Sequence, residues 1–161
     1  MSGRPHILLT NDDGADSPLF VLTIEALSQL GELSIAVPAS EQSWRGKSMS
    51  RVGTVRVEQI ELAGLPAYSI AGTPADCVNI ALHNLLDRRP DVVVSGANIG
   101  RNTGLGFVLS SGTVGGCLEG NIAGLPGLAL SQSLDREVFR QWATERTFDS
   151  ETIAHLRATM N

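Results

Sequence analysis

The segment Ile7-Leu8-Leu9-Thr10-Asn11-Asp12-Asp13-Gly14 decides the fold, because an apolar run leads directly into two adjacent carboxylates and a glycine. A short apolar run that ends at a glycine turn is typical of a buried parallel strand. In an open α/β sheet, ligands bind just beyond the carboxyl ends of such strands. Two carboxylates there are unfavourable unless a cation neutralises them. The segment therefore predicts a site for Mg²⁺ or Mn²⁺, which prefer oxygen ligands, with an ordinary solvated turn as the alternative.

The residues after this strand predict a strand–helix–strand unit. Ser17 as N-cap and Pro18 at the first helical position start a helix, whose apolar residues recur with helical spacing until Gly31. Residues 33–37 then form a second apolar run, which Pro38 follows. We expect the two strands to be parallel and joined by a right-handed crossover.

Four further segments extend the expected sheet. Residues 54–60 and 67–70 predict a β-hairpin, with residues 61–66 between its strands. Residues 91–96 contain three successive β-branched valines and end in glycine, and they predict the clearest central strand. Residues 128–130 predict a last core strand. These runs, with helices between them, indicate an α/β fold with a mainly parallel sheet.

Helices are expected between and after these strands. The capping-box pattern of residues 73–76 starts a helix that continues through Leu85, and capping alone explains its threonine and aspartate. Residues 110–114 open a helix of small residues. Residues 136–161 are polar with an apolar stripe, which predicts a helix and a second short helix from near Ser150.

Polar loops leave the same edge of the sheet as the aspartate pair. Residues 39–51 carry serine hydroxyls and three basic side chains that suit a phosphate or a metal, with a mobile surface loop as the alternative. Residues 97–106 contain two Asn-x-Gly steps, which can present successive backbone N–H groups to an anion. The helix start at residues 110–114 offers more N–H donors. Oxygen ligands beside anion cradles fit metal-assisted phosphate hydrolysis.

Composition excludes several classes of protein. With 161 residues the chain is expected to form one domain, and 42% hydrophobic residues can form a packed core. A net charge of −5 argues against a nucleic-acid polymer as partner. Cys77 and Cys117 form no metal-type pair, so we expect free buried thiols in a reducing compartment. No apolar run could span a membrane and residues 1–5 do not resemble a signal peptide, so a cytoplasmic protein without membrane contact is expected.

Familiar motifs of other enzymes are incomplete in this chain. Gly46-Lys47-Ser48 resembles the end of a P-loop, but Glu41 stands where the first glycine should be. There is no Gly-x-Gly-x-x-Gly fingerprint and no Gly-x-Ser-x-Gly elbow. The strand at residues 91–96 ends without the aspartate of a phosphorelay receiver, and the three histidines are too scattered for a zinc pair.

Four motifs together resemble the SurE (survival protein E) family of 5′-nucleotidases. They are Asn11-Asp12-Asp13-Gly14, the run from Ala71 to Val78, the run from Ser95 to Gly104, and Ser111-Gly112-Thr113-Val114 with Glu119-Gly120. The resemblance implies a Rossmann-like three-layer domain with a mainly parallel central sheet. It also implies one Mn²⁺ or Mg²⁺ ion per subunit, a nucleoside 5′-monophosphate as substrate, activity on 3′-monophosphates and short polyphosphate, and a homodimer or homotetramer.

The resemblance also implies roles for individual residues. The metal ligands of the family correspond to Asp12, Asp13, Ser43 and Asn98, of which Asp12, Asp13 and Asn98 would act in catalysis. The phosphate would be held by residues of the first motif, of the glycine-rich run and of the following helix start, namely Asn11, Gly96, Gly100, Asn102, Gly104, Ser111, Gly112 and Thr113.

The chain departs from the family pattern in two places. The usual Ser-Gly or Ser-Ala step is Ser43-Trp44 here, and residues 105–110 lack the usual acid and contain one extra residue. We expect residues 1–131 to form the SurE-type core, with the hairpin inserted near residues 54–70. Residues 132–161 would form a helical segment without the C-terminal lobe of the family. The alternative function is therefore a truncated or diverged member that binds metal or nucleotide without turnover.

Overall fold

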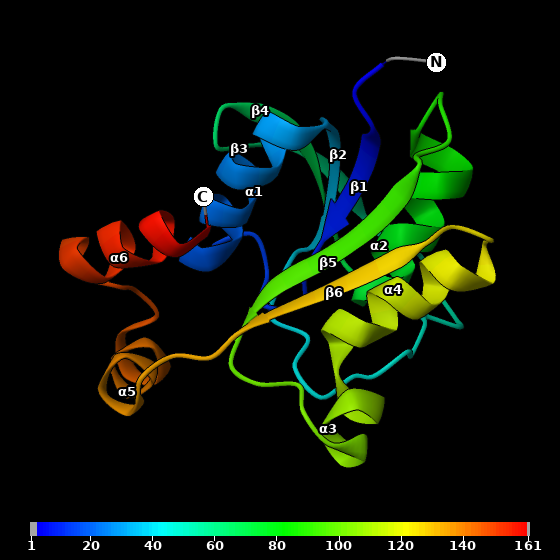
Figure 1. Ribbon diagram of the computed structural model, residues 1–161. Coiled ribbons are helices and arrows are strands. Elements are labelled where there is room, and N and C mark those ends of the chain that lie inside the picture. Colours follow the sequence, from blue (N-terminus) through cyan, green and yellow to red (C-terminus); the bar gives the residue numbers. More distant parts are fainter. Residues whose placement is uncertain (1–2, 161) are drawn as a thin grey trace.

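The computed structural model describes residues 3–160, which fold around one six-stranded sheet (Figure 1). In chain order, the elements are β1 (His6–Thr10), α1 (Pro18–Leu30), β2 (Glu32–Pro38), β3 (Val57–Leu62), β4 (Leu65–Ile70), α2 (Pro74–Ile80), the π-helical turn η1 (Ala81–Leu85), β5 (Val92–Ile99), α3 (Leu105–Ser110), α4 (Gly112–Ile122), β6 (Gly127–Gln132), α5 (Arg136–Glu145) and α6 (Ser150–Met160).

The sheet has the strand order β3-β4-β2-β1-β5-β6, and every pairing except the β3–β4 hairpin is parallel. Helix α1 with α5 and α6 lies on one side of the sheet, and α2 with α4 lies on the other (Figure 1). This arrangement confirms the expected Rossmann-like α/β fold. Because β1 lies between β2 and β5, the loops after these three strands leave the same edge of the sheet.

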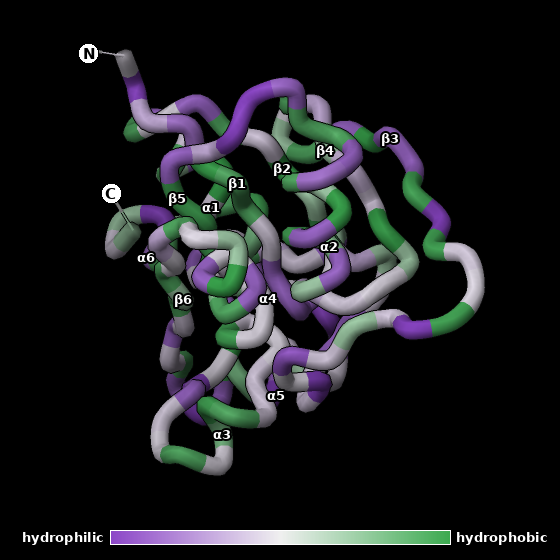
Figure 2. Tube along the Cα trace, turned by 90° about the vertical axis from the view of Figure 1, so that its right-hand side faces the viewer, coloured by the Kyte–Doolittle hydropathy of each residue, from purple (hydrophilic) through white to green (hydrophobic). Residues whose placement is uncertain are grey.

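Apolar residues on the two faces of the sheet form two separate core clusters. On β1, Leu9 packs in the cluster beneath α1 with Phe20, whereas Leu8 packs in the opposite cluster with Val78 of α2. Strands that are covered on both faces have continuous apolar runs in their sequences. Figure 2 shows this hydropathy along the chain, with mostly hydrophobic residues in the central strands.

The predicted helix starts are confirmed. The Ser17 side chain accepts a hydrogen bond from the N–H of Phe20, and Pro18 occupies the first turn of α1. At α2, Thr73 and Asp76 form a reciprocal capping box. These caps satisfy N–H groups that would otherwise have no partner at a helix start.

The predicted bounds of both hairpin strands were wrong. The hairpin strands are Val57–Leu62 and Leu65–Ile70, because Ala63 and Gly64 both adopt positive φ in a tight two-residue turn. Pro66 lies inside β4, where pairing with β2 begins only at Ala67, so its missing N–H interrupts no bond of that ladder.

The central strand β5 also extends further than residues 91–96. It continues to Ile99, and after an irregularity between Ser95 and Asn98 its end pairs with residues 131 and 132 of β6. The loop expected from Ala97 therefore begins later, and Asn98 lies on the strand itself. A strand positions a side chain more rigidly than a loop does.

Helices α5 and α6 pack on the sheet through a third apolar cluster. Trp142, Phe148 and Leu156 belong to this cluster together with Leu22 of α1 and Ile99 of β5. The helices expected after residue 136 and near Ser150 are therefore present, while the proposed division of the chain at residue 131 stays a prediction. Within residues 3–160, no helix combines the length and apolar character needed to cross a bilayer.

The contact between α4 and β5 leads to a stability prediction. A Cβ atom on Gly120 would lie 2.6 Å from a methyl carbon of Val93, whose side chain is fully buried. We expect Gly120→Ala to lower the free energy of unfolding by about 1–3 kcal/mol through overpacking, measured by urea denaturation. Gly106→Ala is the control, since no atom lies within 4 Å of its added Cβ. Equal stability of both variants would contradict the tight α4–β5 contact.

Candidate active site

A cleft of about 850 Å³ opens beyond the carboxyl ends of β1 and β5. Its walls come from the loops after β1 and β2, the end of β5 with the loop that follows, the junction of α3 and α4, and helix α5. Of the predicted site residues, those that line the cleft are Asp12, Asp13, Ser43, Asn98, Gly100, Asn102 and Ser111.

Asp12 is buried and bound to the start of α4. Its Oδ1 atom accepts a hydrogen bond of 2.7 Å from the Thr113 hydroxyl. A Cβ atom on Gly112 would lie 2.8 Å from the Cβ of Asp12, so glycine permits this close approach. Burial, opposed by the hydrogen bonds from Thr113, raises the pKa of Asp12 above its ordinary value.

Asp13 connects the first loop to β5. Its Oδ2 atom accepts a 2.9 Å hydrogen bond from the backbone N–H of Ile99, the residue after Asn98. Burial, followed by repulsion from the Asp12 carboxylate, raises the pKa of Asp13 to about 7. The structure therefore brings the carboxylates of the first strand beside the strand that carries Asn98.

Asn98 and Ser43 add neutral oxygen atoms to the same cleft. The Nδ2 group of Asn98 donates to the Gly100 carbonyl at 3.1 Å, which leaves its Oδ1 oxygen without a partner among residues 3–160. The Ser43 hydroxyl donates to Glu41 at 2.7 Å. The second carboxylate oxygen of Glu41 pairs with Arg146 at 2.8 Å.

Sequence reasoning missed Glu41 and Arg146, which both line the cleft. The Arg146 guanidinium also lies 5.1 Å from the ring centre of Trp142 on α5. Glu41 stood in a polar loop that was singled out, but its partner lies more than a hundred residues further along the chain and belongs to no motif.

The remaining predicted residues support the cleft from outside its lining. The Asn11 side chain donates to and accepts from the backbone of Gly14, which closes the turn after β1. Gly96 lies against β6, since an added Cβ would overlap the Leu130 carbonyl oxygen. Gly104, with φ of +86°, starts α3. The Asn102 side chain, which lines the cleft, donates to Thr113.

The expected anion nest is partly used within the protein. The N–H groups of Ile99 and Gly100 donate to Asp13 and to the Gln132 carbonyl, respectively. These two N–H groups are therefore not available to an external anion.

The donor set fits a hard divalent cation. It contains two carboxylates, one amide oxygen and one hydroxyl, which are ligands that Mg²⁺ and Mn²⁺ accept. Both carboxylates have raised pKa values, because the effect of burial outweighs the hydrogen bonds that favour their charged forms. Among residues 3–160, no group of three or more His, Cys, Asp or Glu side chains is arranged to hold a metal.

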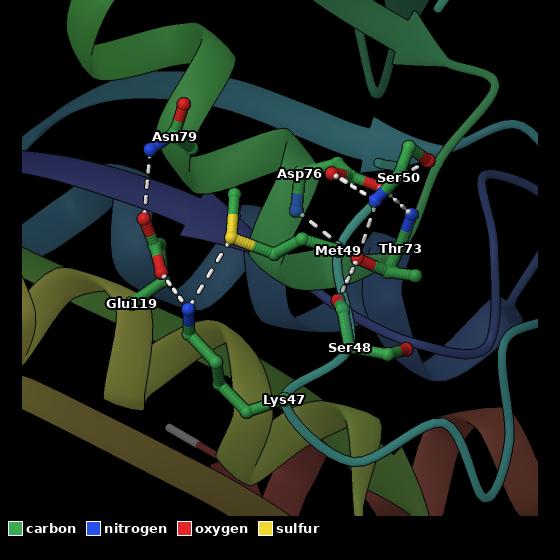
Figure 3. Close-up of polar contacts among 8 residues, drawn as sticks. All are labelled: Lys47, Ser48, Met49, Ser50, Thr73, Asp76, Asn79 and Glu119. Atoms are coloured by element: carbon green, nitrogen blue, oxygen red, sulfur yellow. Dashed lines mark hydrogen bonds and ion pairs between the residues drawn. The ribbon is translucent and has the colours of Figure 1, made fainter. Parts of the chain in front are cut away.

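A polar network fastens the loop of Ser43 to helices α2 and α4 (Figure 3). Glu119 of α4 pairs with Lys47 at 2.5 Å and accepts a hydrogen bond from Asn79 of α2. On the other side of the network, Asp76 accepts hydrogen bonds from the N–H and hydroxyl groups of Ser50. The capping box thus has a second role, since it holds the far end of the loop.

Comparison with known proteins gives consistent results. The family model described as "Survival protein SurE" matches residues 7–160. The "5′-nucleotidase SurE" of Methanopyrus kandleri is 45% identical over 129 residues, which cover 80% of this chain and 49% of that protein. The protein of the same name from Thermofilum pendens is 42% identical over 129 residues, with the same coverage. The chain spans about half the length of these relatives.

A solved structure resembles the fold as well. The crystal structure of the SurE protein from Aquifex aeolicus superposes with a TM-score of 0.74 at 32% identity. The match covers 98% of this chain and 60% of the Aquifex chain. The likeness therefore includes helices α5 and α6.

Removing the Asp76 carboxylate should loosen the loop that carries Ser43. We expect Asp76→Ala to lower the free energy of unfolding by about 2–3 kcal/mol, because it removes a cap and leaves buried donors without partners. Urea denaturation measures this loss, and limited proteolysis of residues 39–56 reports the loosening. Glu58→Ala is a control, since its exposed ion pair with Arg56 is long at 3.8 Å. Unchanged stability and proteolysis of the Asp76 variant would refute the anchoring role.

The raised pKa of Asp13 predicts pH-dependent metal binding. Its protonated form stabilises the metal-free fold below the unfolded pKa of 3.8, and this stabilisation is lost as pH rises through about 7. A cation requires the ionised form, so Mn²⁺ should bind about tenfold more tightly at pH 8 than at pH 6. Calorimetric titration measures this ratio, and Asp13→Asn should reduce both the affinity and its pH dependence. Equal affinity at the two pH values would contradict a pKa near 7 for Asp13, and unchanged affinity in Asp13→Asn would show that Asp13 is no ligand.

Proposed function

The chain belongs to the SurE family, and from this premise we propose that it is a metal-dependent phosphatase acting on nucleoside 5′-monophosphates. One observation carries the proposal: Asp12 and Asp13 lie in the same cleft as Asn98 and Ser43. A cleft of about 850 Å³ is within the range of about 300–1,000 Å³ typical of small-molecule sites.

In this proposal, Asp12 and Asp13 hold one Mg²⁺ or Mn²⁺ ion, and Asn98 and Ser43 supply the neutral oxygen ligands. A bound ion of this kind polarises a phosphoryl oxygen and lowers the pKa of a bound water. The hydrogen bonds from Thr113 and from the Ile99 N–H fix the orientation of the two carboxylates before the ion arrives. Such pre-organised ligands need no rearrangement during the reaction.

Positively charged groups around the cleft favour the binding of an anionic substrate. The start of α4 lies beside Asp12, and a helix N-terminus favours negative charge. Three arginines line the cleft, namely Arg101, Arg136 and Arg146. We propose that Ser111, Gly112 and Thr113, with Asn102 and Gly104, receive the phosphate, and that these arginines attract it.

The proposal extends to 3′-monophosphates and short polyphosphate. The phosphate is held at a site formed mainly by backbone and small polar groups, which do not distinguish the remainder of the substrate. The arginines on the α5 side offer charge for additional phosphate groups.

We also propose that the protein is cytoplasmic and forms a homodimer or homotetramer. The two cysteines are free and buried, which suits a reducing compartment. Leu118, Ile122 and Leu128 expose apolar side chains on the neighbouring elements α4 and β6, and such surface supports contact with a second subunit.

Removing the first carboxylate should abolish activity. We expect Asp12→Ala to reduce Mn²⁺-stimulated phosphate release from AMP at least about 100-fold, because the cation loses a ligand. Phosphate release is measured across a panel of metals and nucleotides. Asp16→Ala is the matched control, because Asp16 is exposed in the same loop and should retain full activity. Unchanged phosphate release by the Asp12 variant would refute the proposal.

A further inference from the structure

Two exposed aromatic rings stand together on one wall of the cleft. Trp44, next to Ser43, and Phe107 of α3 both line the cleft, with ring centroids 5.4 Å apart and planes tilted by 49°. Trp44 is 69% exposed and Phe107 is 51% exposed. Figure 2 shows the hydrophobic character of α3 at this end of the molecule. The pair therefore presents apolar ring surface to solvent at the cleft.

Trp44 also has an unfavourable backbone conformation, which burial of its ring does not compensate. Its φ of +63° lies in the left-handed region, which favours glycine and is unfavourable for a bulky side chain. The ring gains little burial in return. Residues in unfavourable backbone conformations cluster at active sites and ligand-binding sites, and Trp44 lies at the wall of this cleft.

Backbone hydrogen bonds on both sides of Trp44 hold the loop that carries the ring. The Gln42 N–H donates to the Asp12 carbonyl at 2.7 Å, and the Gly46 N–H donates to the Ser110 carbonyl at 2.8 Å. The backbone of Gly46 approaches α3 so closely that an added Cβ would lie 2.8 Å from the Leu109 carbonyl oxygen. The loop thus joins the aspartate turn to α3, and the two rings are pre-organised relative to the aspartate pair.

We propose that Trp44 and Phe107 form a stacking wall for the base of a nucleotide whose phosphate lies at the start of α4, beside the proposed cation site of Asp12 and Asp13. This inference rests on the proposed function. Every nucleobase has an aromatic face, so stacking binds bases without reading their hydrogen-bonding groups. The wall therefore contributes affinity for nucleotides over other phosphomonoesters and little discrimination between bases. The contact with Phe107 holds the Trp44 ring in place.

The test compares a substrate with a base and one without, namely AMP and ribose 5-phosphate. Trp44→Gly removes the ring and suits the positive φ, so the loop can keep its course. We expect its KM for AMP to rise about 5- to 100-fold with kcat changed less than twofold, and the rise to be absent for ribose 5-phosphate. Trp44→Phe should restore most of the affinity. Leu105→Ala is the control, since Leu105 is exposed on α3 outside the cleft lining and should leave the KM for AMP unchanged.

Other outcomes would overturn the proposal. An unchanged KM for AMP, or an equal loss for AMP and ribose 5-phosphate, would show that the ring does not contact the base. If the native chain releases no phosphate with any metal, the proposed function fails, and the dissociation constant of AMP with Mn²⁺ tests the wall instead. Weaker AMP binding by Trp44→Gly would then support the wall, whereas equal binding, or none by the native chain, would refute it.

Discussion

The site depends on two adjacent carboxylates kept close together at the end of a buried strand. Each carboxylate is fixed by a different neighbour, Asp12 by the Thr113 hydroxyl and Asp13 by the N–H of Ile99. Hydrogen bonds to the charged form oppose the effects of burial and repulsion, but both pKa values remain raised. The metal-free fold therefore keeps an unfavourable concentration of acidic groups that a divalent cation would relieve.

The parallel sheet explains why these neighbours are available. Strands β1 and β5 pair directly, so the turn after β1 meets the end of β5 without a long connection. Helix α4 crosses beside them closely enough that glycine is required at residues 112 and 120, where a Cβ atom would meet Asp12 and Val93, respectively. The same close packing that buries the core thus brings a helix N-terminus against the carboxylates.

The sequence allowed prediction of those features that local rules determine. The apolar run into Asp12, the cap at Ser17 and the box at Thr73 each depend on a few neighbouring residues, and the structure has all three. The sequence was less informative where tertiary contacts determine the bounds of an element. At the end of β5, for example, pairing with β6 continues the strand past Gly96. Helix α3 was not expected, because its six residues are largely exposed and show no amphipathic period. The ion pair of Glu41 with Arg146 joins distant segments that no spacing rule connects.

That ion pair also links the last helices to the chemistry proposed for the cleft. Glu41 accepts a hydrogen bond from Ser43, a proposed ligand, and pairs with Arg146, which stacks over Trp142. Trp142 belongs to the apolar cluster that fastens α5 and α6 to α1 and β5. The orientation of the Ser43 hydroxyl is therefore coupled to helices that contribute no predicted ligand. Because Glu41 is acidic and close enough to repel Asp12 and Asp13, its pairing with Arg146 offsets part of the negative charge that the site would otherwise carry.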